Sequence, residues 1–174
     1  MTGWLACSPC AAQPADPQIA ATLNGFYRVH QQSSQDGIPD VAQRAKYEPY
    51  ISPVLDNLLA DAEAADARFK KANPDSPPMI EGDLFSPNFE GITSFQIGAC
   101  AVKGDSAQCK MQLHYAVAHP APQDKPVDWA DTVSLLNTSA GWRVDDVAFG
   151  GHWDFGNHGT LKALLKDSIA NANN

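Results

Sequence analysis

Residues 141–151 have the sequence GWRVDDVAFGG, in which the apolar side chains change parity part of the way along. Trp142 and Val144 are even-numbered, whereas Val147 and Phe149 are odd-numbered. Because successive side chains of a strand point to opposite faces, a regular strand cannot bury all four against one core. One extra residue at the aspartate pair between them, a β-bulge, would bring both halves onto one face. A flat sheet that is buried on both faces is the alternative.

We therefore expect a curved antiparallel sheet that bends at Asp145-Asp146 and has helices on its concave side. A proline after a capping residue predicts the start of one helix at Asp16-Pro17 and of a longer one at Ser52-Pro53. Period-two patterns predict four strands after residue 93, and Thr160 caps a last helix. The order predicts one α+β domain over residues 16–172, with a four-stranded sheet wrapped around the N-terminal helices.

The first two predicted strands contain a pair of cysteines. Between them, Lys103-Gly104-Asp105-Ser106 has the composition of a hairpin turn. If Val102 pairs with Ala107, Cys100 lies directly opposite Cys109, at a separation that a disulfide accepts. Two opposed free thiols are the alternative. A disulfide favours the periplasm or the outside of the cell. A second bulge, at Gly98, would place the two halves of the first strand on one face.

The composition excludes several classes of function. The chain has 174 residues, 44% of them hydrophobic, and a formal net charge of −8. This charge disfavours nucleic acids and anionic membranes as partners and is compatible with a basic protein. No apolar run is long enough to cross a membrane. Residues 1–15, with Cys7 and Cys10, are expected to be the remnant of an export signal or a flexible N-terminus.

Four motifs carry a resemblance to a known family: residues 26–28 (FYR), 50–53 (YISP), 81–85 (EGDLF) and 142–147 (WRVDDV). They look like a bacterial family of small cell-envelope domains of unknown function, often lipoproteins. The resemblance spans about residues 16–170. It implies a cystatin-like or nuclear-transport-factor-2-like α+β cone in the cell envelope, with a lipid anchor as an option. A homodimer is a further option that the resemblance does not address.

The loop after the fourth strand is rich in aromatic and histidine side chains. We predict that it contacts a partner, together with the proline-rich connector at residues 119–127. His152, Asp154 and His158 could instead bind zinc, but their spacing matches no known metal motif, so we predict neither a metal nor a cofactor. The predicted partner-binding residues are His119, Asp124, His152, Trp153, Asp154, Phe155 and His158.

The interior of the cone is a second candidate site. Its predicted polar lining is Tyr27, Arg28, Tyr47, Asp83 and Asp146. Asp83, Asp145 and Asp146 could supply a pair of carboxylates for acid–base chemistry. We favour a structural role, in which one caps backbone and another pairs with Arg28 or Tyr27. His30 lies on the apolar stripe of the first helix and is interpreted as a core histidine.

These features predict a non-enzymatic protein-binding module of the bacterial envelope. An immunity-type protein that neutralises a basic antibacterial toxin is the favoured version, and an accessory lipoprotein of an envelope complex is the other. Small-molecule binding inside the cone is a second hypothesis. An enzyme that uses the carboxylates or the late histidines is the third.

Overall fold

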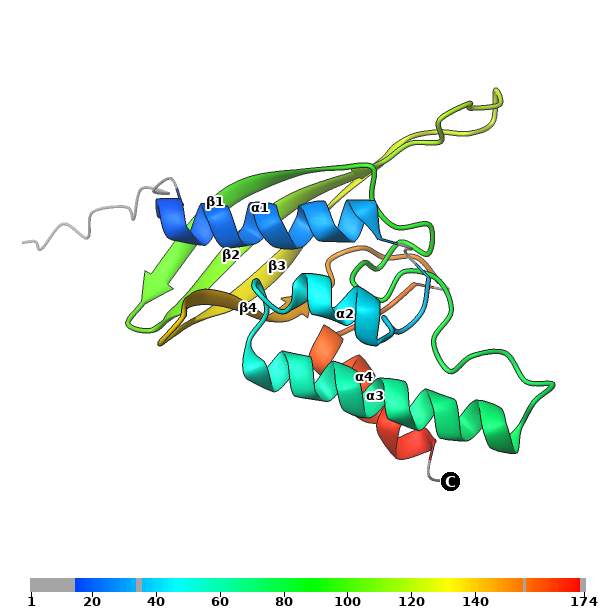
Figure 1. Cartoon of the computed structure of the whole chain (residues 1–174). Coiled ribbons are helices and arrows are strands. Elements are labelled where there is room, and N and C mark those ends of the chain that lie inside the picture. The colour runs from blue at the N-terminus through cyan, green and yellow to red at the C-terminus, as the bar shows by residue number, and fades with distance from the viewer. Residues whose placement is uncertain (1–14, 34–35, 155, 173–174) are drawn as a thin grey trace, which may run out of the picture.

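The computed structural model describes residues 15–33, 36–154 and 156–172. Cys7, Cys10 and Phe155, which enter the predictions, lie outside the described residues. The elements are α1 (Pro17–Gln32), α2 (Val41–Tyr47), α3 (Pro53–Ala72), β1 (Ser94–Lys103), β2 (Ser106–Tyr115), β3 (Val127–Thr138), β4 (Gly141–Ala148) and α4 (Leu161–Asn171) (Figure 1).

The strands form one antiparallel sheet in the order β1-β2-β3-β4, which does not close into a barrel, and this confirms the predicted α+β class and four-stranded meander. Figure 1 shows α1 lying along the sheet, where it contacts β1 and β4. Helices α3 and α4 pack against each other and against β4. A single buried apolar cluster joins the helices to the inner face of the sheet. No helix among the described residues is long and apolar enough to cross a bilayer.

The predicted helix starts are confirmed. Asp16 accepts a hydrogen bond from the Gln18 amide before α1, and Ser52 accepts one from Leu55 before α3. Helix α2 was not predicted from the sequence. This helix begins with a capping box, in which Asp40 and Gln43 bond each other's backbone amides.

The predicted bulge in β4 is confirmed. Leu135 of β3 pairs with Val144 and the preceding Ser134 pairs with Asp146, so that Asp145 stands outside the register. Val144 and Val147 are consequently both fully buried, although they differ in parity. The bulge thus places both halves of the strand on the core side.

The predicted bulge in β1 is also present. Ile97 pairs with Met111 and Cys100 pairs with Cys109, so two residues of β1 face Lys110 alone. A Cβ atom at Gly98 would lie 3.0 Å from the backbone oxygen of Lys110, a contact that glycine avoids.

Cys100 and Cys109 form the predicted disulfide across these two strands, with a Cα–Cα distance of 4.1 Å. The predicted pairing of Val102 with Ala107 sets this register. Cys109 is completely buried on the inner face. The disulfide therefore ties the edge strand to the core.

Candidate functional site

Three loops leave the sheet at the same end. Residues 82–93 lead into β1, residues 116–126 connect β2 to β3, and residues 149–159, called the C-terminal loop below, follow β4. The antiparallel register fixes this arrangement, because the start of β1 pairs with the end of β2 and the end of β4 pairs within the first half of β3. Figure 1 shows the 116–126 loop projecting furthest from the sheet. We call this region the three-loop end.

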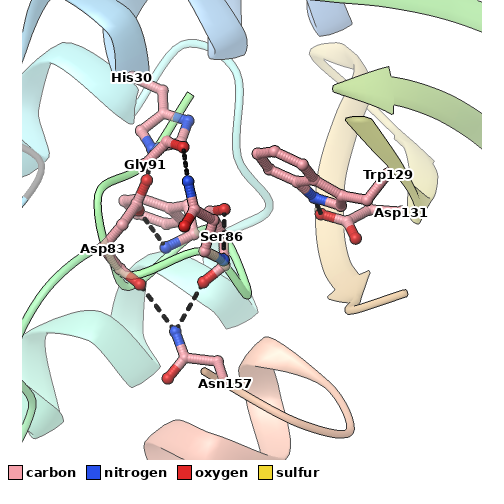
Figure 2. Close-up of polar contacts among 9 residues, drawn as sticks. His30, Asp83, Ser86, Gly91, Trp129, Asp131 and Asn157 are labelled. Atoms are coloured by element: carbon pink, nitrogen blue, oxygen red, sulfur yellow. Dashed lines mark hydrogen bonds and ion pairs between the residues drawn. The ribbon is translucent and has the colours of Figure 1, made fainter. Parts of the chain in front are cut away.

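The C-terminal loop is fastened to its surroundings at both ends. The Gly150 amide donates to Asp131 Oδ1 at 2.8 Å. The Phe149 amide donates to the backbone oxygen of Gly159 at 3.0 Å. The side-chain amide of Asn157 donates to the backbone oxygens of Asp83 and Ser86, at 2.7 and 2.8 Å (Figure 2). The loop is therefore held against both β3 and the 82–93 loop.

Among the predicted contact residues of this loop, His152, Asp154 and His158 are exposed. Trp153 is half-buried, because its ring packs edge-on against Trp129 with 5.1 Å between ring centroids. A Cβ atom at Gly151 would collide with the Trp153 ring, so glycine permits this packing. The predicted aromatic anchor thus lies partly against the sheet, while the polar side chains face solvent.

The 116–126 loop carries the other two predicted contact residues, His119 and Asp124, and both are exposed. The Asp124 carboxylate accepts the Ala121 amide at 2.8 Å, and the Asp124 amide donates to the Ala121 oxygen at 2.9 Å. These two bonds form a local turn in the projecting segment. The exposed ring of Phe89, in the 82–93 loop, adds an apolar group to the same end of the molecule.

Metal-ligating side chains do not gather at this end. Within the part of the chain that the structure describes, no group of three or more His, Cys, Asp or Glu side chains is placed to hold a metal ion. The three candidate zinc ligands, His152, Asp154 and His158, therefore do not converge.

A buried polar cluster lies beneath the three-loop end. His30 Nε2 is 2.6 Å from Asp83 Oδ2, and both side chains are about 1% exposed. The other carboxylate oxygen of Asp83 accepts the Phe85 amide at 2.8 Å. His30 is thus a core histidine, and its neighbour is the aspartate that the sequence places in the interior. Figure 2 shows this pair beside Ser86 and Asn157.

Asp131, which was not among the predicted site residues, is completely buried on the inner face of β3. Its carboxylate accepts the Gly150 amide and lies 3.4 Å from Trp129 Nε1 (Figure 2). The pKa of Asp131 is raised to about 6, chiefly by burial, since a charge is costly away from water, and to a smaller extent by the charge of Asp83. The Gly150 and Trp129 hydrogen bonds and the charge of His30 act in the opposite direction.

Tyr27 completes the cluster. It is fully buried, stacks on Phe95 with 5.1 Å between ring centroids, and has a hydroxyl without a hydrogen-bond partner among the described residues. Burial, followed by the charges of Asp131 and Asp83, raises the pKa of the Tyr27 phenol well above its ordinary value. Tyr27 is therefore a neutral phenol at physiological pH.

The five predicted pocket residues do not meet around one cavity. Tyr47 and Asp83 line a cavity of about 10 Å³, which has room for roughly one water molecule. Burial raises the pKa of the Tyr47 phenol. Arg28 is exposed on α1, which corrects its predicted inward position. Asp146 lies in the β4 bulge, where its carboxylate accepts the Val147 and Lys162 amides at 2.9 and 3.0 Å.

The neighbouring Asp145 also has a structural role. Its carboxylate accepts the Ser52 hydroxyl at 2.6 Å and pairs with Lys162 Nζ at 2.8 Å. The expected partners of such an inward carboxylate were Arg28 and Tyr27. The actual partners come from the start of α3 and from α4, so the aspartate pair fastens the bulge to two helices.

The chain matches no protein-family model, and no curated protein sequence matches it at a significant level.

Proposed function

We propose that this chain is a non-enzymatic protein-binding module of the bacterial cell envelope, and that its binding surface is the three-loop end. The observation that carries the proposal is the fastening of the C-terminal loop, which presents His152, Asp154 and His158 to solvent on a fixed backbone. A surface that is ordered before binding loses less conformational entropy when a partner docks, and this favours recognition.

The charge of this surface indicates the kind of partner. Exposed carboxylates are present on all three loops or beside them, at Glu90, Asp124, Asp128 and Asp154, against one exposed lysine there, Lys125. The whole chain has a formal net charge of −8. Electrostatic complementarity therefore favours a basic protein. A basic toxin delivered by a rival cell fits this description, and the chain would then act as an immunity-type protein.

The location in the envelope rests on the Cys100–Cys109 disulfide, a bond that persists in oxidising compartments. The resemblance to small bacterial envelope domains with a cystatin-like or nuclear-transport-factor-2-like cone agrees with this location. An accessory lipoprotein of an envelope complex would use the same surface, so the two versions differ in the partner and not in the site.

The proposal is tested with an exposed-loop variant, His152→Ala/Asp154→Ala/His158→Ala, and a matched control, Asp61→Ala/Asp167→Ala, which changes exposed residues of α3 and α4. Partners captured from envelope extract are identified and purified, and their affinities are measured by calorimetry. We expect a basic partner to bind the wild type at micromolar concentration or below.

The loop variant should then bind at least about tenfold more weakly, a loss of about 1.4 kcal/mol, and the control should bind like the wild type. Inhibition of the partner's toxic activity would identify an immunity protein, and co-assembly without inhibition an accessory subunit. A partner that binds the loop variant as tightly as the wild type would disprove the proposed surface.

A further inference from the structure

The C-terminal loop covers the buried carboxyl group of Asp131. Asp131 is completely buried, and its Oδ1 accepts the amide of Gly150 at the start of the loop. The loop lies directly on β3, because a Cβ atom at Gly150 would collide with the backbone of that strand. The Trp153 ring packs against Trp129, whose indole nitrogen faces Asp131 Oδ2. Movement of the loop away from β3 would bring water to this carboxylate.

Three other titratable groups face Asp131 from the elements packed against β3. Tyr27 and His30 come from α1, and Asp83 comes from the 82–93 loop. Tyr27 is a neutral phenol, so the neighbours that can carry a charge are the Asp83 carboxyl group and its partner His30. The like charge of Asp83 opposes ionisation of Asp131, and a charged His30 would favour it.

We infer that Asp131 is a proton-dependent latch: its protonation stabilises the closed C-terminal loop, and its ionisation weakens that closure. This inference rests on the proposed function only in that the C-terminal loop is part of the proposed binding surface. The movement of the loop belongs to the free protein and is measurable without a partner.

The direction follows from linkage. In the closed structure the pKa of Asp131 is about 6, against an ordinary value of 3.8 for an aspartate in water. A group that binds its proton more tightly in the closed state stabilises that state below the lower pKa. This stabilisation of the closed state is lost as the pH rises through the higher pKa, that of the closed state. The ratio of closed to open loop should therefore fall between pH 4 and pH 7, by at most about a hundredfold.

The test combines two measurements on the wild-type protein. Carboxyl-carbon NMR gives the titration midpoint of Asp131, which we expect near pH 6. Amide hydrogen exchange, corrected for its intrinsic pH dependence, gives the opening of the C-terminal loop at each pH. Protection of the Gly150 amide should decrease as the pH rises from about 4, and it should level off near pH 6, where Asp131 of the closed protein titrates.

Variants separate the latch from other titrating groups. Asp131→Asn keeps an oxygen for the Gly150 amide but cannot ionise, so its loop protection should be independent of pH between 4 and 7. His152→Gln/His158→Gln removes the histidines of the loop, and Asp128→Asn removes an exposed carboxylate of the same strand that pairs with His114. Both controls should keep the wild-type response.

Three results would each overturn the latch. The first is an Asp131 carboxyl group that titrates below pH 5. The second is corrected loop protection that stays constant or rises with pH in the wild type. The third is a response that disappears in the double histidine variant. If Asp131→Asn fails to fold, the wild-type titration and exchange still decide the question, and loss of partner binding by the exposed-loop variant has no bearing on it.

Discussion

Asp145 and Asp146 are adjacent in the chain, yet they hold two different helices. Asp145 contacts the capping hydroxyl of Ser52 at the start of α3 and the ammonium group of Lys162. Asp146 accepts the backbone amide of Lys162, in the first turn of α4. The bulge makes this division possible, because it places two successive carboxylates on the same side of the sheet edge. At this position a local irregularity of the strand fixes the positions of the helices.

Replacement of Asp145 by alanine should lower the free energy of unfolding by about 2 kcal/mol. The change removes two charge-assisted hydrogen bonds and leaves Lys162, whose side chain is 20% exposed, without its carboxylate partner. Chemical denaturation monitored by circular dichroism measures the effect. The control is Asp167→Ala, an exposed position on α4 that should change stability by less than about 0.5 kcal/mol. Equal stability of the two variants would contradict the proposed role of Asp145.

Single residues show where sequence reasoning succeeds and where it fails. The change of parity between Val144 and Val147 favours the bulge, because a regular strand would place the two side chains on opposite faces. The alternation of buried and more exposed residues in β3 also indicates that Asp131 is buried. Asp131 shares the parity of Trp129 and Val133, so it had to be buried as they are. Arg28 was misplaced, since one residue along a helix rotates the side chain by roughly 100° from buried Tyr27.

The β1–β2 hairpin combines a fixed pairing register with the Cys100–Cys109 disulfide. The pairing of Val102 with Ala107 brings Cys100 opposite Cys109, and the irregularity after Ile97 shifts the rest of the strand by one residue. Without this shift, Ile97 would point to the opposite face of the sheet from Cys100. The bulge and the disulfide are therefore parts of one arrangement that attaches an edge strand to the core.

The double variant Cys100→Ala/Cys109→Ala should keep the fold and lose about 2–3 kcal/mol of unfolding free energy, because a short loop is no longer closed in the unfolded chain. Thermal unfolding with and without a reducing agent measures this. The reducing agent should destabilise the wild type and leave the variant unchanged. A variant as stable as the oxidised wild type would show that pairing of the strands alone holds the hairpin.

Elements differ in how far the sequence predicts them. The long helices α1 and α3 have a cap, a proline at the start and several turns of apolar periodicity, and all three signals agree. Helix α2 has seven residues and only one of them, Tyr47, is buried, so periodicity is weak there and its capping box is the one usable signal. The 82–93 loop has no regular pattern, and tertiary contacts such as those of Asn157 determine its shape.

On the scale of the whole molecule, charge opposes the compact fold. A formal net charge of −8 on 174 residues produces mutual repulsion of surface carboxylates, which salt screens. The buried polar cluster contributes little to the salt dependence of stability, because salt screens buried charges much less than surface charges. The carboxylates of the three-loop end are exposed and therefore screened by salt, so the affinity of this surface for a basic protein should also decrease as salt is added.

Raising sodium chloride from about 10 to about 200 mM should increase the midpoint of thermal unfolding by roughly 2–4 °C, as repulsion between surface carboxylates is screened. Differential scanning calorimetry in a neutral buffer measures the change. The variant Asp61→Lys/Asp167→Lys, which replaces two negative surface charges with positive ones, should show a smaller response. A midpoint that falls as salt is added would mean that attractive surface ion pairs outweigh the repulsion.

Function is predicted less completely than fold, for a physical reason. Burial and periodicity constrain every residue of the core, whereas a binding surface is a few exposed side chains that only a partner selects. His152, Asp154 and His158 could be predicted as exposed because a glycine-rich loop surrounds them. The bonds that hold this loop come from Asp83, Ser86 and Asp131, which are distant in the chain, and no local pattern indicates them.

The outer edge of β4 carries a further consequence for how this molecule behaves in a crowded compartment. Val144 exchanges backbone hydrogen bonds with Tyr50 and Ser52, and Ala148 forms a bridge to Thr160. The chain therefore occupies this border itself. A strand from a neighbouring copy could pair with β4 at these positions only after the segments that precede α3 and α4 had moved away from the edge.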